Sequence, residues 1–114
     1  MGEEAAEPTA DEAISAMPRY LDSAKAGSMD KSIQINLSGD GGGSWWLKIK
    51  DGAAESGRGE LQNPDLTLSS SAADYVLILT GKLDGASAFM SGRLRVKGDM
   101  ALAISFGTLF KRPG

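Results

Sequence analysis

Few side chains in this sequence could support acid–base or metal chemistry. Its 114 residues include no histidine and no cysteine, which excludes the usual general base near neutral pH and any thiolate. A Ser-His-Asp triad and a zinc site with the usual ligands are therefore impossible. Lys82 and Asp84 could exchange a proton, but they flank a predicted helix end without any partner motif. Helix capping explains them better, and we predict no catalytic residue, no metal site and no cofactor.

Basic side chains alternate along one short segment near the C-terminus. Arg93, Arg95 and Lys97 occupy every second position, so a strand would place them on one face. Such a face is either simply solvated or attracts the phosphate groups of an acyl-CoA or of anionic membrane lipids. The net charge of −3 and the lack of a strongly basic tract argue against a nucleic-acid partner.

A glycine-rich run, GDGGG at residues 39–43, could in principle cradle a phosphate group. A phosphate-binding loop of that kind ends in GKS or GKT and leads into a helix. Here the run lies between two segments that alternate in polarity, so it predicts a hairpin turn.

Large apolar side chains are frequent in the C-terminal third of the chain. Phe89 and Met90 end a short predicted helix before a glycine, and the last helix is apolar over more than one face. Both features suit either an ordinary core or the wall of a ligand pocket, for which methionine is well adapted. Trp45 shares a strand face with Leu47 and Ile49 and is most simply a core aromatic.

Local patterns also place the elements that must position these side chains. Residues 9–12 (TADE) fit a capping box, Pro18 predicts a break in the first helix, and Gly27 ends the second. Strands are predicted at 33–37, 44–50, 53–59, 66–68 and 93–97, and helices at 71–79, at 84–90 and after Asp99. The helix over 71–79 is apolar almost all round and is expected to be largely buried.

This order of elements predicts an α+β fold with helices packed on a mainly antiparallel sheet. The length suits one domain over residues 9–112 after a flexible acidic tail at 1–8. No run of about 18 apolar residues is present to span a membrane, and neither a basic, apolar leader nor a peroxisomal tripeptide is visible. We therefore expect a cytoplasmic protein.

Two longer segments resemble the sterol carrier protein type 2 family of lipid-binding domains. They are SIQINLSGDGGGSWWLKIKDG at 32–52 and PDLTLSSSAADYVLILTGKLDGASAFMSGRLRVKGDMALAISF at 64–106. The order of the glycines, the Phe-Met pair, the basic alternating strand and the apolar helix carries the resemblance. Ser91 and Gly107 stand where many members of that family have glutamine.

The resemblance implies a five-stranded, mainly antiparallel sheet covered by helices and enclosing a hydrophobic tunnel. The side chains that it suggests for the tunnel come from both halves of the chain: Trp45, Leu79, Leu83, Phe89, Met90, Leu94, Val96, Met100, Ile104, Phe106 and Phe110. Arg93, Arg95 and Lys97 would contact a lipid head group or a membrane.

The expected function is non-enzymatic binding and transfer of an apolar lipid: a fatty acid, fatty acyl-CoA, phospholipid or sterol. The expected partners are that ligand and, transiently, a membrane surface, with the chain a monomer or weak homodimer. The alternative is a structural or protein-interaction module that uses its apolar helices to bind a partner or a second copy.

Overall fold

The first helix begins where the capping box predicted. In the computed structural model, which describes residues 9–110, the Thr9 hydroxyl accepts from the Glu12 N–H at 3.1 Å and the Glu12 carboxylate accepts from the Thr9 N–H at 2.9 Å. Pro18 then falls in a 3₁₀ helix, and Gly27 ends the next α-helix. The expected acidic tail at 1–8 and the end of the expected domain at 111–112 lie outside the described residues.

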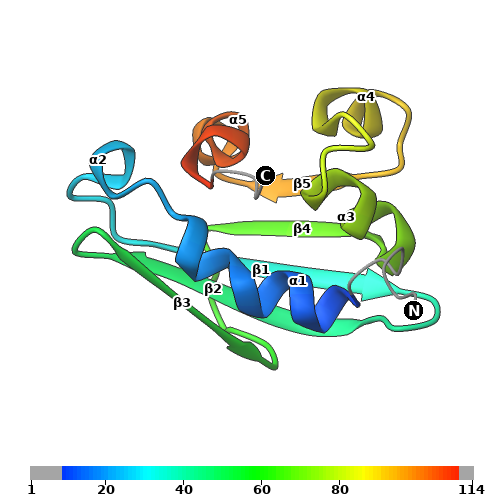
Figure 1. The fold of residues 1–114 in the computed structure, drawn as a ribbon, viewed down its shortest axis with the longest axis horizontal. Helices are drawn as coiled ribbons and strands as arrows, with labels where there is room; N and C mark the ends of the chain where they lie inside the picture. Colours follow the sequence, from blue (N-terminus) through cyan, green and yellow to red (C-terminus); the bar gives the residue numbers. More distant parts are fainter. Residues whose placement is uncertain (1–8, 111–114) are drawn as a thin grey trace, which may run out of the picture.

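A five-stranded sheet forms the body of the structure, and the helices cover one of its faces (Figure 1). The helices are α1 (Ala10–Ala16), the 3₁₀ helix η2 (Met17–Tyr20), α2 (Ser23–Ala26), α3 (Ala72–Leu79), α4 (Gly85–Met90) and α5 (Met100–Leu109). The strands are β1 (Lys31–Ser38), β2 (Gly43–Lys50), β3 (Ala53–Arg58), β4 (Leu66–Ser71) and β5 (Arg95–Gly98). None of the helices within residues 9–110 is long and apolar enough to cross a bilayer.

The strand order is β3-β2-β1-β4-β5, and every pair except β1–β4 is antiparallel. The predicted α+β class and the mainly antiparallel sheet are therefore confirmed. The parallel pair arises because the chain passes from β3 to the far side of β1. The Gln34 side chain bonds to the segment that connects β3 to β4. Its oxygen accepts from the Leu61 N–H at 2.7 Å, and its amide group donates to the Gly59 carbonyl at 3.1 Å.

The core lies between the sheet and the helices. Strand alternation sends apolar side chains to the helix side, and the register aligns Ile35 with Trp45 on β2 and with Leu68 on β4. All three of these side chains are buried. The opposite face carries the polar members of the same alternation, as expected for a sheet with one covered face.

Helix α3 differs from its prediction. Tyr75 and Val76 are buried, but Ile78 and Leu79 are only half-buried. Ile78 and Leu79 line an open pocket. The sequence pattern could not distinguish such a side chain from one that packs against protein.

Strand β5 is shorter than predicted. It begins at Arg95 because the Arg93 and Leu94 amides donate to the Ala88 carbonyl at 2.8 and 3.0 Å, as part of the turn that ends α4. Those two amides are therefore unavailable to the strand ladder. Gly92, with a φ of 82°, allows the chain to make this turn.

Asp99 caps α5 and makes the fold sensitive to acid. Its carboxylate accepts from the Leu102 N–H at 3.0 Å and pairs with the Lys31 ammonium at 2.9 Å, and both interactions lower the pKa of Asp99. Because the folded pKa lies below the unfolded one of about 3.9, the stabilisation is fully present above the unfolded pKa and is lost as the pH falls through the folded pKa.

We expect the melting temperature to fall on acidification, and to fall less in Asp99→Asn, which still caps a helix but has no charge to lose. Thermal melts followed by circular dichroism over that pH range would measure how the melting temperature changes with pH in the unaltered chain and in the variant. The pKa of Asp11 is also lowered, chiefly by the hydrogen bond from Trp45, so the variant should retain part of the dependence. Equal slopes would contradict a contribution from Asp99.

Candidate functional site

An apolar pocket of about 690 Å³ lies between the helices and the β4–β5 side of the sheet. Helices α4 and α5 lie beside β5, with α3 near the end of β4 and α1 over the other strands (Figure 1). The apolar wall residues are Ala13, Ala16, Met17, Leu68, Ile78, Leu79, Ala86, Phe89, Leu94, Val96, Met100, Ala103, Ile104, Phe106 and Phe110.

Helical and strand periodicity explain why these side chains share one space. On α3, Tyr75, Ile78 and Leu79 are three and four residues apart and so lie on one face of the helix. On β5, Val96 points to the helix side with its neighbour Leu68 on β4. The rings of Phe106 and Phe110 pack against each other with centroids 5.3 Å apart.

Large apolar side chains at one part of the wall are open to solvent. Phe89 is 46% exposed, Met100 47% and Ile104 81%, although all three line the pocket. Exposed side chains of this size on neighbouring elements mark an interaction site rather than a core. We call Phe89, Met100 and Ile104 the apolar rim.

The pocket gathers most, but not all, of the side chains predicted from the sequence. It is lined by Leu79, Phe89, Leu94, Val96, Met100, Ile104, Phe106 and Phe110. Leu83 and Met90 are not among its lining residues, and Met90 is 84% exposed. That the eight lining residues bind a lipid stays a prediction.

Trp45 lies away from the pocket, in the core beneath α1. It is 1% exposed, its indole N–H donates to the Asp11 carboxylate at 2.8 Å, and the Arg58 guanidinium lies 4.9 Å from its ring centre. It lies on β2, the fourth strand from the β5 edge, and is not among the residues that line the pocket. The simpler interpretation of Trp45, a core aromatic, agrees with this position.

Sequence reasoning did not select several of the wall residues, including Tyr75, Ile78 and Ala103. The spacing of Tyr75, Ile78 and Leu79 was an available signal, because it predicts one shared helix face. Ala103 carried no such signal, since an alanine on an apolar helix is equally common in a packed core.

The polar groups of the wall are mostly occupied by local structure. Glu12 belongs to the capping box, Asp84 accepts from the Ser87 N–H at 2.9 Å, and the Thr80 hydroxyl donates to the Val76 carbonyl at 2.9 Å. Within residues 9–110, no lysine or arginine lines the pocket. The site therefore suits burial of an apolar molecule better than charge recognition.

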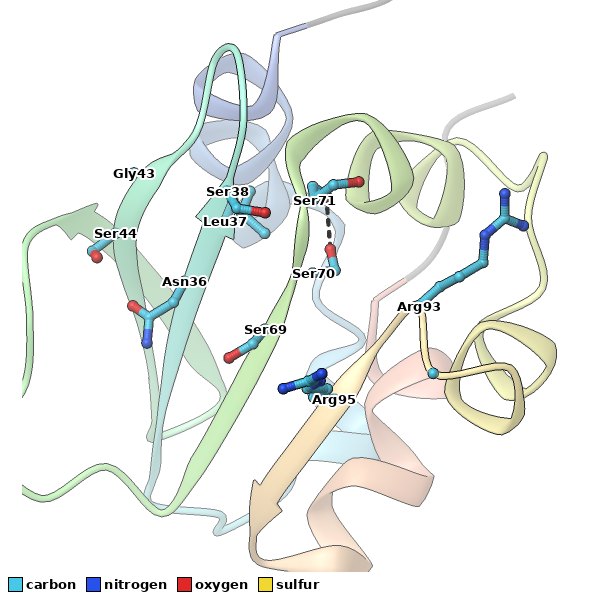
Figure 2. Close-up of a pocket in the computed structure, with 11 residues that line it drawn as sticks. Asn36, Leu37, Ser38, Gly43, Ser44, Ser69, Ser70, Ser71, Arg93 and Arg95 are labelled. Carbon is cyan, nitrogen blue, oxygen red and sulfur yellow. Dashed lines mark hydrogen bonds between the residues drawn. The ribbon is translucent and has the colours of Figure 1, made fainter.

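A second, polar pocket of about 540 Å³ lies on the opposite face of the sheet. Register places Asn36 beside Ser69 and Ser69 beside Arg95, and Figure 2 shows these three side chains on one face. Arg93 also lines this pocket, with its guanidinium Nε 3.7 Å from the Asp74 carboxylate. Lys97 lies on the same face of β5 but does not line the pocket.

Comparison with known proteins decides the family. The family model described as the SCP-2 sterol transfer family matches residues 10–111. This chain belongs to that family. The resemblance stated from the sequence is confirmed, and the five-stranded sheet with its helices is the SCP-2 fold.

Relatives with this domain are much longer than the chain. Hydroxysteroid dehydrogenase-like protein 2 of Bos taurus is 42% identical over 80 residues, which cover 69% of this chain and 19% of that protein. The sec-alkylsulfatase Pisa1 of Pseudomonas sp. superposes with a TM-score of 0.81 at 22% identity, covering 94% of this chain and 17% of that one. The region that matches this chain is thus a small part of both proteins.

A solved SCP-2 protein of similar size is the palmitated SCP2L2 of Aedes aegypti. It superposes with a TM-score of 0.72 at 22% identity, covering 93% of this chain and 96% of that one. At this identity the likeness establishes the fold. The SCP-2 family supports lipid binding as the activity of the domain.

Proposed function

We propose that this chain binds one apolar lipid in the pocket between α1, α3, α4, α5 and the sheet, and exchanges it with membranes through the apolar rim. The observation that carries this proposal is a pocket of about 690 Å³ with an apolar wall and exposed Phe89, Met100 and Ile104 at its edge. The volume falls within the range of roughly 300–1,000 Å³ typical of small-molecule sites. A tunnel that continues through the domain is part of this proposal.

The ligand classes proposed are a fatty acid, a fatty acyl-CoA, a phospholipid or a sterol. Burial of alkyl chain would supply the affinity, at about 0.8 kcal/mol for each methylene group. Membership of the SCP-2 family supports this assignment, and the mosquito protein with the same fold is described as palmitated.

We infer that the chain itself performs no chemistry. It has no histidine or cysteine, and the wall carboxylates Glu12 and Asp84 act in helix capping. No dehydrogenase or sulfatase activity is proposed for it, because it corresponds to about a fifth of the relatives with those names.

The decisive experiment is mass spectrometry of an organic extract of the purified chain, with displacement of a fluorescent fatty acid as the second measurement. We expect co-purified lipid and saturable displacement. If both measurements are negative, lipid binding is refuted. Self-association or capture of a protein partner through exposed Phe89, Met90 and Ile104 would then favour the interaction module.

Arg93, Arg95 and Lys97 are proposed to attract anionic membranes. Arg95 and Lys97 project from the face of the sheet opposite the apolar pocket, so the sheet separates them from a ligand inside it. Arg93 lies in the turn before β5 and pairs with Asp74 of α3. Strand β5 is an edge strand, and α4 and α5 lie beside it (Figure 1). A membrane at that edge could therefore contact both the basic side chains and the apolar rim.

We expect Arg95→Gln with Lys97→Gln to weaken binding to vesicles containing phosphatidylserine by roughly 5-fold per charge, since each basic residue near such a surface contributes about 1 kcal/mol. Binding should also fall as salt is added. Vesicle co-sedimentation at several salt concentrations measures both effects. Lys50→Gln, an exposed change on β2, is the matched control. An equal loss of vesicle binding in both variants, or binding that does not depend on salt, would reject the assignment.

A cytoplasmic location, a monomeric or weakly dimeric state and domain limits of 9–112 also remain proposals. They rest on the sequence features described above.

A further inference from the structure

One polar group in the wall of the apolar pocket lacks a strong partner. The Tyr75 side chain is 2% exposed, and its hydroxyl donates to the Met17 sulfur at 3.8 Å. A thioether is a weak acceptor, whereas a buried tyrosine hydroxyl usually finds a stronger one. Both Tyr75 and Met17 line the pocket, so this weakly bonded donor belongs to two residues of its wall.

The state of the hydroxyl is also determined by its surroundings. Burial raises the pKa of Tyr75 far above its usual range, because a phenolate would be poorly solvated there. A tyrosine hydroxyl is already neutral at physiological pH, and burial keeps this one a neutral O–H donor in alkaline solution as well. An oxygen acceptor on a ligand would replace a weak hydrogen bond with a normal one.

The charged side chains that line the pocket are acidic. Glu12 and Asp84 line it, and no lysine or arginine does so among the residues that the structure describes. A carboxylate in such a wall would lose hydration without gaining a counterion. An ester, ketone or alcohol would avoid that cost and still accept from Tyr75.

We propose that the Tyr75 hydroxyl is the polar anchor of the pocket, and that the pocket selects a lipid with an uncharged oxygen over a carboxylate of the same chain length. This inference rests on the proposed lipid binding and specifies the ligand class for that site. Tyr75 acts as a specificity-determining residue, and alkyl burial supplies most of the affinity.

The test uses four ligands with similar chains: dodecane, dodecanol, methyl laurate and laurate. Each displaces Nile red, a neutral dye, whose own affinity is measured for every variant. We expect Tyr75→Phe to lower the affinity for dodecanol and for methyl laurate by roughly 5- to 10-fold, because one buried hydrogen bond to the ligand is lost. The affinity for dodecane, which has no hydrogen-bond acceptor, should change by less than about 2-fold.

Ser105→Ala is the control, because it removes a hydroxyl from α5 at a residue that does not line the pocket. It should leave all four affinities nearly unchanged. Met17→Leu removes the sulfur and keeps the hydroxyl, so the preference for dodecanol over dodecane should persist or increase. This variant keeps the inference testable if Tyr75→Phe folds poorly in a thermal melt.

Charge selection is tested with Glu12→Gln plus Asp84→Asn, which preserve the capping hydrogen bonds. The double variant should reduce the ratio of the affinity for methyl laurate to the affinity for laurate by about 2- to 5-fold. The effect should be no larger, because the altered side chains are solvent-exposed and their charges are screened. The affinity for methyl laurate should change less than the affinity for laurate.

Three results separate the possible failures. If none of the four ligands displaces the dye from the unaltered chain, the proposed lipid binding fails. If the ligands bind but Tyr75→Phe affects them all equally or not at all, Tyr75 is not the anchor. If laurate binds the unaltered chain as tightly as methyl laurate, the selection against a carboxylate is wrong.

Discussion

Replacement of Ala103 with tryptophan is expected to reduce lipid binding by about 10-fold or more while the domain stays folded. Ala103 is a half-buried residue of α5 that lines the pocket, so the indole ring would occupy space that a ligand needs. Exclusion of two methylene groups alone removes about 1.6 kcal/mol of binding free energy, which corresponds to more than a 10-fold change in Kd, at about 1.4 kcal/mol per factor of ten.

The effect on stability should be small, because the ring enters an open pocket rather than a filled core. Ala101→Trp is the matched control, since Ala101 is exposed on the same helix and does not line the pocket. Both variants carry the same propensity change. Co-purified lipid and fatty-acid displacement would be measured for each, and normal binding by Ala103→Trp would show that the ligand lies elsewhere.

The largest loss of stability is expected for Gly98→Ala, at about 3 kcal/mol or more. Gly98 ends β5 with a φ of 111°, a conformation that side chains rarely adopt. An added methyl group would also collide with the Asp65 backbone oxygen. That oxygen accepts from the Asp99 N–H at 2.8 Å, so the collision would disturb the start of α5 and one wall of the pocket.

Gly92→Ala separates the two causes of this loss. Gly92 also has a positive φ, at 82°, but an added methyl group would meet nothing within 4 Å. Its cost should therefore be only the backbone strain, roughly 1–2 kcal/mol. Urea denaturation of both variants gives the comparison, and equal losses would mean that the contact with Asp65 does not matter.

Local chemistry made much of the fold predictable. Thr9 and Asp99 were expected to cap helices and do so, because capping depends on a side chain and amides only three residues away. The alternation of Val96 with Arg95 and Lys97 predicted which side chains share a face of β5. Local patterns also indicated five strand segments, and the family resemblance implied that these segments form one sheet.

Other features depended on contacts that are distant in the sequence. The parallel pairing of β1 with β4 follows from where the chain crosses the sheet. Trp45 and Val96 both point to the helix side of strands, yet only Val96 reaches the pocket. Alternation defines the face on which a side chain lies, but it does not say which element covers that face.

By itself, the sequence determined the family, the positions of the helices and strands, and the absence of histidine and cysteine chemistry, because these follow from residue types and short spacings. Only the tertiary structure decided that Tyr75 from α3, Val96 from β5 and Ile104 from α5 share one wall. It also decided that the Tyr75 hydroxyl faces a methionine sulfur from η2, 58 residues earlier in the chain. The packing of α3, α5 and η2 against one sheet brings those groups together, and no pattern within a single element records that packing.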